Sequence, residues 1–320
     1  MNTTYEIPPY SKPRTYGDKF LRDLHKNPVV IQEKIDGSQF SFYKTEAGEL
    51  LFKTRNKMIT PDTCEAQFRP TVDHLLANAD AIVPGWIYRG EAMSSARHNK
   101  LKYDRVPKGH LVLYDIQTED GFADENLIEV AAAAIGLEAV RQFSVLVAGR
   151  QMDDEMFKSL MAQGSQLGGV CEGVVLKNYY RNDPADETKV LMAKIVSAEF
   201  REKKTSSMPK STLNLDSIID TYRTETRWEK AVQHLRDSGT IEGTPKDIGA
   251  IMAEVQRDVE EEEKENIKDL LYSKFRKPIL KGVSDGVAQW YKDSLMAKDS
   301  TEEPPRADLV SPGDSEASNA

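Results

Sequence analysis

A lysine and two glutamates stand in three short segments whose residue types suit phosphoryl chemistry. Lys34 begins the segment Lys-Ile-Asp-Gly, directly after an apolar stretch and at the start of a tight turn. Glu91 ends the segment Tyr-Arg-Gly-Glu, and Glu172 begins Glu-Gly-Val-Val-Leu-Lys, which ends at Lys177. Three such segments in one order predict a site where a lysine amine attacks a nucleotide phosphate.

The amine of an ordinary lysine is a poor nucleophile at neutral pH, because its pKa of about 10.4 keeps it protonated. We expect a closed pocket and neighbouring cations to lower the pKa of Lys34. Attack on the α-phosphate of a nucleoside triphosphate would then give a lysyl-nucleotide. Glu172 offers a carboxylate oxygen suited to Mg²⁺, while Lys177 and Lys194 would stabilise charge on the phosphates. Tyr114 could stack on a purine base.

The surrounding residues predict an α+β domain that ends near residue 204. Apolar or alternating residues predict strands over 29–34, 39–43, 49–55, 111–116, 170–177 and 189–196. Helices are predicted over 61–78, 124–135 and 153–163. Acidic residues in the first turns of the last two helices agree with the helix dipole.

Beyond residue 204 the pattern becomes helical. Residues 203–210 predict a linker, and Thr244 followed by Pro245 predicts a helix start. Helical spacing continues over 254–275, where Glu260–Glu263 predicts a solvated face. The domain prediction is therefore an adenylation-type domain at 1–204, a helical domain at 205–298 and a disordered acidic tail at 299–320.

Composition narrows the class of protein. The net charge of −9 is largely due to the tail, where residues 299–320 hold six acids and one arginine, so a basic groove elsewhere stays possible. The sequence has no apolar run of the roughly 18 residues needed to span a bilayer, and its start lacks a signal-peptide pattern. Two cysteines without metal-ligand spacing favour a reducing cytoplasm.

Six segments together resemble the ordered motifs of the covalent nucleotidyltransferases, the superfamily of ATP-dependent DNA and RNA ligases and mRNA capping enzymes. They are Lys34–Gly37, Lys53–Asn56, Tyr88–Glu91, Leu113–Ile116, Glu172–Lys177 and Met192–Val196. The resemblance covers residues 30 to about 203. It implies an N-terminal nucleotidyltransferase domain of the ATP-grasp-like ligase adenylation type, with antiparallel sheets, followed by a small all-α domain.

Within this superfamily the chain is most similar to the nick-sealing RNA ligases. A helical segment follows the last motif in place of a β-rich OB domain, and no R-x-D-K signature follows it. Residues 199–203 also resemble the continuation in that group. The chain departs from the family at Met192, where a lysine usually stands, which leaves open whether Lys194 acts alone or with Lys189. Asp36 is a second departure, because some relatives carry histidine there.

The resemblance implies a role for each residue of the site. Lys34 would form the covalent adenylate, and Glu172 would help hold the metal. Glu33 would lie beside the adenine through its backbone, with Tyr114 stacked on the ring. The remaining nucleotide contacts implied are Asp36, Glu91 on the ribose, Arg55 on sugar or phosphate, and Lys177 and Lys194 on the phosphates.

The implied function is an ATP-dependent RNA ligase that uses Mg²⁺ or Mn²⁺ and acts in RNA repair on RNA ends or on nicked duplexes containing RNA. No membrane partner and no obligate protein partner are evident. Two alternatives stay open, a DNA ligase without an OB domain and a non-catalytic protein that binds nucleic-acid ends. Residues 97–105, which are basic with an interleaved aromatic, would contact an RNA backbone or form a solvated loop.

Overall fold

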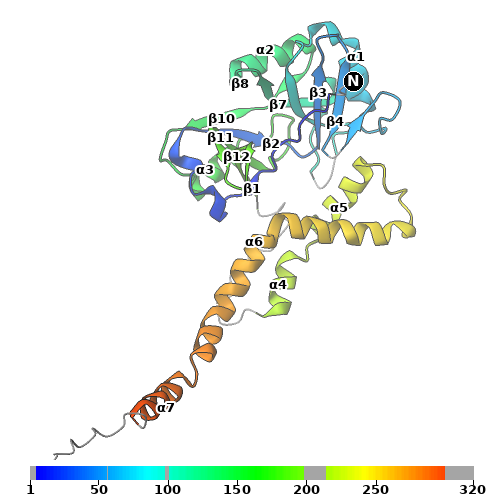
Figure 1. Ribbon diagram of the computed structural model, residues 1–320. Helices are drawn as coiled ribbons and strands as arrows, with labels where there is room; N and C mark the ends of the chain where they lie inside the picture. The colour runs from blue at the N-terminus through cyan, green and yellow to red at the C-terminus, as the bar shows by residue number, and fades with distance from the viewer. Residues whose placement is uncertain (1–4, 56, 98–100, 198–213, 300–320) are drawn as a thin grey trace, which may run out of the picture. The chain divides into compact units, whose positions relative to one another are not determined.

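The computed structural model describes residues 5–55, 57–97, 101–197 and 214–299 (Figure 1). The chain forms two compact units, one up to Ile267 and one from Lys268. The predicted linker at 203–210 lies outside the described residues, as does the predicted tail at 299–320 apart from Asp299, which is helical. In the part of the chain that is described, no helix is both long enough and apolar enough to span a membrane.

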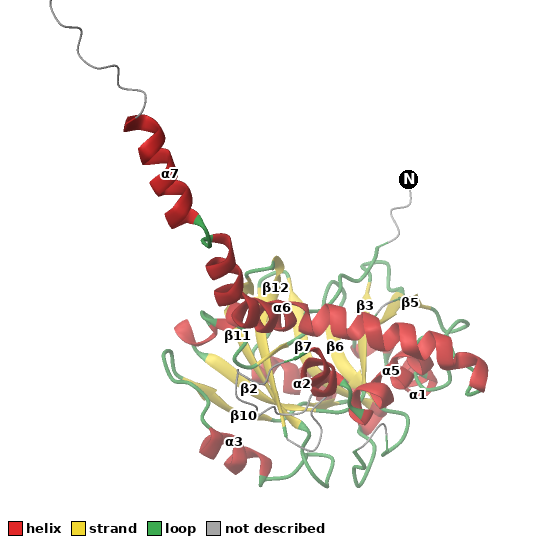
Figure 2. Cartoon of the chain, turned by 90° about the horizontal axis from the view of Figure 1, so that it is seen from below, coloured by secondary structure: helices red, strands yellow, loops and turns green. Residues whose placement is uncertain are grey.

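A five-stranded sheet contains the strand that ends at Lys34. Its strands, in spatial order, are β1 (Arg14–Thr15), β12 (Asp186–Val196), β11 (Gly173–Asp183), β2 (Val29–Lys34) and β10 (Gln142–Leu146). All neighbours are antiparallel except the parallel pair of β1 with β12. The labelled strands of this sheet lie together in the view from below (Figure 2).

A second sheet holds the segments that contain Glu91 and Tyr114. Its main path runs through β5 (Met58–Ile59), β4 (Leu50–Thr54), β3 (Ser38–Lys44), β6 (Ile87–Ala92), β7 (Leu111–Thr118) and β8 (Gly121–Phe122). A short strand, β9 (Glu138–Ala139), pairs with β7 in parallel. The chain passes from the first sheet into the second through Ile35–Gly37, so Lys34 lies where the two sheets meet.

Helices cover the outer faces of the sheets. Helices α1 (Arg69–Ala77) and α2 (Glu125–Ile135) pack on the second sheet in a core that includes Phe40, Phe52, Val72 and Ile128. Helix α3 (Asp154–Met161) and the 3₁₀ turns Lys19–Leu21 and Leu24–Lys26 pack on the first sheet.

Strand alternation separates core from site on β11. Val174 and Leu176 point into the core under α3, while Val175 and Lys177 line the opposite face. Leu191 and Ala193 on β12 alternate in the same way with Met192 and Lys194. The faces that carry the predicted site residues are thus left free of the main cores.

The predicted strands are confirmed, while one helix begins later than predicted. Residues 61–67 form turns, and α1 begins only at Arg69. Thr60 and Thr63 exchange hydrogen bonds between their hydroxyls and backbone amides at 2.9 and 3.2 Å. Pro70 has no backbone N–H and is tolerated in the first turn of a helix, which agrees with a start at Arg69.

Among the described residues that follow in the first unit are α4 (Leu215–Tyr222), α5 (Glu225–Asp237) and the beginning of α6 (Ile248–Val283). The predicted helix start is confirmed, because Thr244 and Asp247 form a capping box ahead of α6. Buried Arg227 on α5 binds both Asp258 and Glu263 on α6. These ion pairs join the two helices.

The predicted solvated face at Glu260–Glu263 is wrong for half of its residues. Glu260 and Glu261 are exposed and pair with Lys264 and Arg257 on the same helix. The side chains of Glu262 and Glu263 are only 9% and 3% exposed. They pair with cations that come from distant parts of the chain, which local sequence cannot reveal.

The described part of the second unit contains the C-terminal part of α6, from Lys268, and α7 (Val287–Asp299). Large apolar side chains, including those of Tyr272, Phe275 and Trp290, are exposed on it.

Candidate active site

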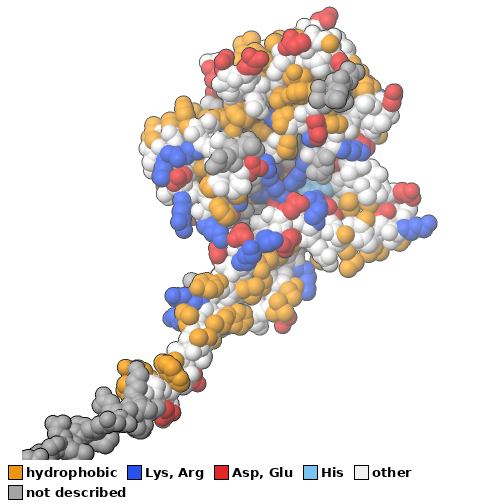
Figure 3. All heavy atoms as spheres, viewed as in Figure 1, with side chains coloured by type: hydrophobic (Ala, Val, Ile, Leu, Met, Phe, Trp, Pro, Cys, Tyr) orange, Lys and Arg blue, Asp and Glu red, His pale blue; other side chains and the backbone are white. Residues whose placement is uncertain are grey.

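A cavity of about 250 Å³ opens between the two sheets and α5. Every residue predicted for the site lines this cavity: Glu33, Lys34, Asp36, Arg55, Glu91, Tyr114, Glu172, Lys177 and Lys194. Lysine and arginine side chains gather around a hollow in the surface of the first unit (Figure 3). The sequence segments are therefore brought together in space as predicted.

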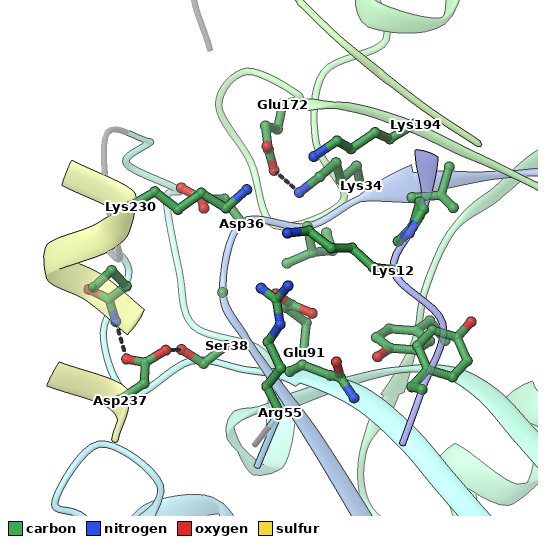
Figure 4. A pocket seen from close by; sticks show the side chains of 18 of the residues that line it. Lys12, Lys34, Asp36, Ser38, Arg55, Glu91, Glu172, Lys194, Lys230 and Asp237 are labelled. Carbon is green, nitrogen blue, oxygen red and sulfur yellow. Dashed lines mark hydrogen bonds and ion pairs between the residues drawn. The ribbon is translucent and has the colours of Figure 1, made fainter. Parts of the chain in front are cut away.

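Lys34 and Glu172 form an ion pair at the end of two paired strands. The antiparallel register of β2 and β11 places Gly173 opposite Lys34, so the preceding residue, Glu172, lies beside the lysine. The Nζ of Lys34 lies 2.7 Å from Oε2 of Glu172 (Figure 4). Gly173 permits the close pairing of β11 with β12, because a Cβ there would lie 2.1 Å from the carbonyl oxygen of Ile195.

The predicted decrease in the pKa of Lys34 is wrong for the protein without nucleotide. Burial and the nearby Lys230 do lower this pKa. Glu172, Glu91 and Asp36 act in the other direction, and their combined charge raises the pKa above its ordinary value. The resting site therefore holds Lys34 as an ammonium paired with the Glu172 carboxylate.

Glu91 faces the nucleophile from the second sheet. It stands opposite Gln39 in the β3–β6 pair, and Gly37 leaves room for it, because a Cβ at that glycine would lie 2.7 Å from Cγ of Glu91. Burial raises the pKa of Glu91 to about 8, with Glu172 and Asp36 adding to the increase and Lys34 opposing it. At neutral pH this carboxyl is mostly protonated, so it can donate a hydrogen bond to a sugar hydroxyl.

Lys177 belongs to a buried network that sequence analysis did not identify. Its Nζ lies 2.9 Å from Oδ2 of Asp115, and both side chains are almost inaccessible. Asp115 also accepts hydrogen bonds from the hydroxyls of Tyr179, at 2.5 Å, and Tyr10. Burial lowers the pKa of Lys177, although Asp115 opposes the decrease. Asp115 stood inside a motif segment, but its three partners come from distant positions.

Tyr114 and Glu33 border the same cavity. Tyr114 is half-buried, with the Lys177 ammonium 4.7 Å from its ring centroid and the Tyr10 ring centroid at 5.3 Å. The Glu33 side chain turns away to accept hydrogen bonds from Oγ of Ser165 at 2.5 Å and from the Gln166 amide at 3.0 Å. This agrees with a contact through the Glu33 backbone.

The segment after Lys34 is supported by Tyr103, whose hydroxyl accepts a hydrogen bond from the Asp36 amide at 2.8 Å. Tyr103 is buried among apolar residues that include Ile35 and Met93. Tyr103, the aromatic residue of the segment 97–105 for which an RNA contact was one of two interpretations, is therefore part of the core. Arg105 in the same segment is held by the Glu138 carboxylate at 2.6 Å.

Helix α5 contributes residues to the cavity that sequence analysis did not predict, including Lys230 and His234. Arg55 donates to Nε2 of His234 at 3.2 Å, and Nδ1 of the same ring contacts Glu254 at 3.0 Å. Burial, together with Arg55 and Lys230, lowers the pKa of His234 to about 4. The ring is therefore neutral, which lets Nε2 accept from Arg55 while Nδ1 donates to Glu254.

Met192 lines the cavity, but its contacts are those of a packing residue. It is 2% exposed, stands opposite Lys177 across the β11–β12 hairpin, and its sulfur lies 3.3 Å from the Tyr10 hydroxyl. Lys189 pairs with Asp186 at 2.8 Å and is not among the residues that line the cavity. Lys189 therefore does not replace the missing motif lysine.

The cavity contains suitable groups for a divalent cation bound partly by a substrate. The described residues include no group of three or more His, Cys, Asp and Glu side chains arranged to hold a metal alone. Glu172 and Asp36 nevertheless face the same space around Lys34. Mg²⁺ commonly takes one or two carboxylates, with phosphates and water completing its shell. The donor set fits that arrangement.

The family model for RNA ligase matches residues 27–196. No curated protein gives a significant match. Among solved structures, the RNA ligase of Naegleria gruberi with PPi is 15% identical with a TM-score of 0.42, and the match covers 61% of this chain and 57% of that one.

Two further solved structures are similar to this chain. An archaeal ATP-dependent RNA ligase is 15% identical with a TM-score of 0.43, over 82% of this chain and 66% of its own. A putative ATP-dependent DNA ligase from Aquifex aeolicus is 16% identical with a TM-score of 0.41, over 89% and 68%. The chain thus spans less than two thirds of the Naegleria and archaeal proteins.

The family model covers more than half of the chain, and its matched segment includes Lys34, Glu91 and Glu172. The chain belongs to the RNA ligase family.

Proposed function

We propose that this protein is an ATP-dependent RNA ligase that joins 3′-OH and 5′-phosphate ends through a lysyl-AMP intermediate. The observation that carries the proposal is the position of the Lys34 amine, 2.7 Å from Glu172 in a cavity that also holds Lys177 and Lys194. The two sheets around this cavity would form an adenylation domain of the ATP-grasp-like ligase type.

In the first step Lys34 must lose a proton to water, because its partner Glu172 would hold the metal. The neutral amine then attacks the α-phosphorus of ATP, so that an N–P bond forms, the bond to the β-phosphate oxygen breaks and pyrophosphate leaves. Mg²⁺ or Mn²⁺ held by Glu172 would neutralise phosphate charge and offset the carboxylate charge that raises the pKa of Lys34.

In the second step an oxygen of the RNA 5′-phosphate attacks the adenylyl phosphorus. The N–P bond breaks, and Lys34 regains a proton as AMP moves to the RNA end. In the third step the 3′-OH attacks the 5′-phosphorus and loses its proton to solvent, a phosphodiester bond forms and AMP leaves. The Lys177 ammonium, close to Tyr114, would stabilise the phosphoryl oxygens during these transfers.

Tyr114 and the Glu33 backbone would hold the adenine, with protonated Glu91 on the ribose. Asp36 would line the nucleotide site, and Arg55, held by His234, would contact sugar or phosphate. RNA ends or nicked duplexes containing RNA would be the partners, and repair of broken RNA would be the process. The two cysteines, Cys64 and Cys171, are free thiols, which suits a reducing cytoplasm.

Sealing of matched nicked duplexes tests this function. One duplex has an RNA strand at the nick and the other has DNA in every strand, and each carries a 5′-phosphate. We expect ATP-dependent sealing of the RNA nick and little sealing of the DNA nick. Equal sealing would favour a DNA ligase without an OB domain, and binding without any sealing would favour a non-catalytic end-binding protein.

A further inference from the structure

Three lysines from different elements converge beside the nucleophile. Lys12 precedes β1, Lys194 lies on β12 and Lys230 lies on α5, and all three line the cavity. Figure 4 shows their side chains pointing toward the space around Lys34 and Glu172. Neither Lys12 nor Lys230 belongs to any motif segment of the sequence.

A carboxylate of the protein itself binds this lysine cluster. The Glu262 carboxylate on α6 lies 2.5 Å from Nζ of Lys12 and 3.5 Å from Nζ of Lys194. Burial raises the pKa of Glu262, but Lys194, Lys230 and Lys12 outweigh it and hold the pKa well below its ordinary value. Glu262 is therefore an anion paired with Lys12 and Lys194, and Lys230 adds a further nearby positive charge.

We infer that Lys12, Lys194 and Lys230 form a phosphate subsite that Glu262 occupies in this conformation and that a phosphate group displaces. The inference rests on the proposed function for the identity of its ligands. Lys12 and Lys230 would supply the cationic charge that Met192 does not provide. The ligand class is a phosphate chain, either the polyphosphate of ATP or the 5′-phosphate end of RNA.

Displacement of Glu262 does not require α6 to leave its place. Asp258 and Glu263 on the same helix are bound separately by buried Arg227. Asp258 also lies 3.4 Å from Lys12. Glu262 could therefore release the lysines by changing its side-chain conformation while the Arg227 pairs hold the helix. A phosphate brings more charge and more acceptor oxygens than a carboxylate, which favours the exchange.

The chain offers a matched control for this contact. Glu265, three residues beyond Glu262 on α6, binds Lys19 at 3.0 Å, and neither residue lines the cavity. This pair has the same chemistry but is about one third exposed. Replacing Glu265 or Lys19 therefore reproduces the change in charge without touching the subsite.

The experiment measures the equilibrium affinity of the full chain for inorganic tripolyphosphate by calorimetry. Lys12→Ala and Lys230→Ala should each weaken binding about tenfold, because each removes a charge-assisted contact. Glu262→Gln should tighten binding severalfold, because the lysines lose their internal competitor. Glu265→Gln and Lys19→Ala should leave the affinity unchanged. Thermal unfolding of each variant verifies that it is folded.

A second arm compares nicked RNA duplexes with 5′-phosphate and 5′-hydroxyl ends. If Glu262→Gln tightens only the phosphorylated duplex, the subsite takes the RNA end, whereas an effect on tripolyphosphate alone assigns it to the ATP polyphosphate. Unchanged affinities in all variants would overturn the inference. Weaker binding by Glu262→Gln would also overturn it, because Glu262 would then position the lysines.

These outcomes are independent of the proposed reaction. Adenylation of Lys34 by labelled ATP is scored on the same variants. A wild-type protein that forms lysyl-AMP while Lys12→Ala binds tripolyphosphate normally would refute the subsite alone. Weakened tripolyphosphate binding in a chain that never becomes adenylated would refute the proposed function and leave the subsite in place.

Discussion

Two lysine–carboxylate pairs border the same cavity, yet the surroundings of each lysine differ. The Lys34 and Glu172 side chains are 21% and 12% exposed, and further carboxylates raise the pKa of this lysine. The Lys177 and Asp115 side chains are 3% and 1% exposed, and burial lowers the pKa of that lysine. We therefore propose that the accessible pair, whose partner can be exchanged, is the reactive one, and that the buried pair supplies a fixed charge.

The largest effect is expected from replacing Lys34, which supplies the amine of the accessible pair. Lys34→Ala and Lys34→Arg should lose sealing of a 5′-phosphate nick, because neither variant has an amine that can lose its proton near neutral pH. If the RNA carries a pre-adenylated 5′ end, Lys34→Ala should still seal it, because the last step needs no lysyl-AMP. Gel assays on both substrates check this prediction, and sealing of the 5′-phosphate nick by Lys34→Ala would contradict it.

Loss of the carboxylate should reduce the stability of the fold more in the buried pair than in the accessible pair. Asp115→Asn leaves the Lys177 cation without its charged partner and weakens the bonds to Tyr10 and Tyr179, so we expect a loss of about 3–5 kcal/mol in the free energy of unfolding. Glu172→Gln should cost less than about 1 kcal/mol while greatly slowing adenylation. Urea unfolding and adenylation rates measured on both variants decide this. Equal losses of stability would remove the distinction between the pairs.

Glu91, whose carboxyl lies beside the accessible pair, should make the free energy of unfolding depend on pH. The pKa of Glu91 is about 8 in the folded protein and has its ordinary, lower value in the unfolded chain. At a pH between these two pKa values, folding therefore takes up a proton at Glu91. The free energy of unfolding falls as the pH rises through this range. From pH 5 to 9, Glu91→Gln should gain on the order of 4 kcal/mol relative to wild type, because roughly three pH units of this range contribute about 1.4 kcal/mol each. If the free energies of unfolding of the two proteins change with pH in parallel, the pKa of Glu91 is not raised in the folded protein.

The smallest effect concerns the segment that joins Lys34 to the second sheet. Tyr103→Phe removes the hydrogen bond to the Asp36 amide and should cost about 1 kcal/mol of unfolding free energy. Adenylation should slow only modestly, because the carboxylates around Lys34 remain. Denaturant midpoints and initial rates provide the measurement. If Tyr103→Phe adenylates as slowly as Lys34→Ala, the tyrosine hydroxyl has a direct role in the reaction.

Sequence patterns predicted the parts of the site that depend on strand spacing. Lys34, Lys177 and Lys194 lie on strands whose alternation can be recognised locally, so their convergence followed from the order of the segments. Asp115 and Tyr10 were not identified as partners of Lys177, because their contacts join residues that are far apart in the chain. The burial of Glu262 was missed for the same reason, since Lys12 and Lys194 come from other elements.

The predicted direction of the Lys34 pKa shift was wrong because a sequence lists charges without their distances. Burial does lower the pKa, as expected, but three carboxylates lie closer than the pattern could show. The start of α1 was placed too early because Pro70, which suits only the first turn of a helix, was not used to locate it. Local patterns thus predicted the elements, while the balance of charge required the tertiary structure.

The most direct test of the account is to locate the nucleotide on the protein. The full chain is incubated with α-labelled ATP and Mg²⁺, digested and mapped by mass spectrometry, with Lys34→Ala as the control. The account predicts one adenylyl group on the peptide that contains Lys34 and none on the folded variant. Label on another lysine, or label that persists in Lys34→Ala, would contradict the central claim that Lys34 is the nucleophile.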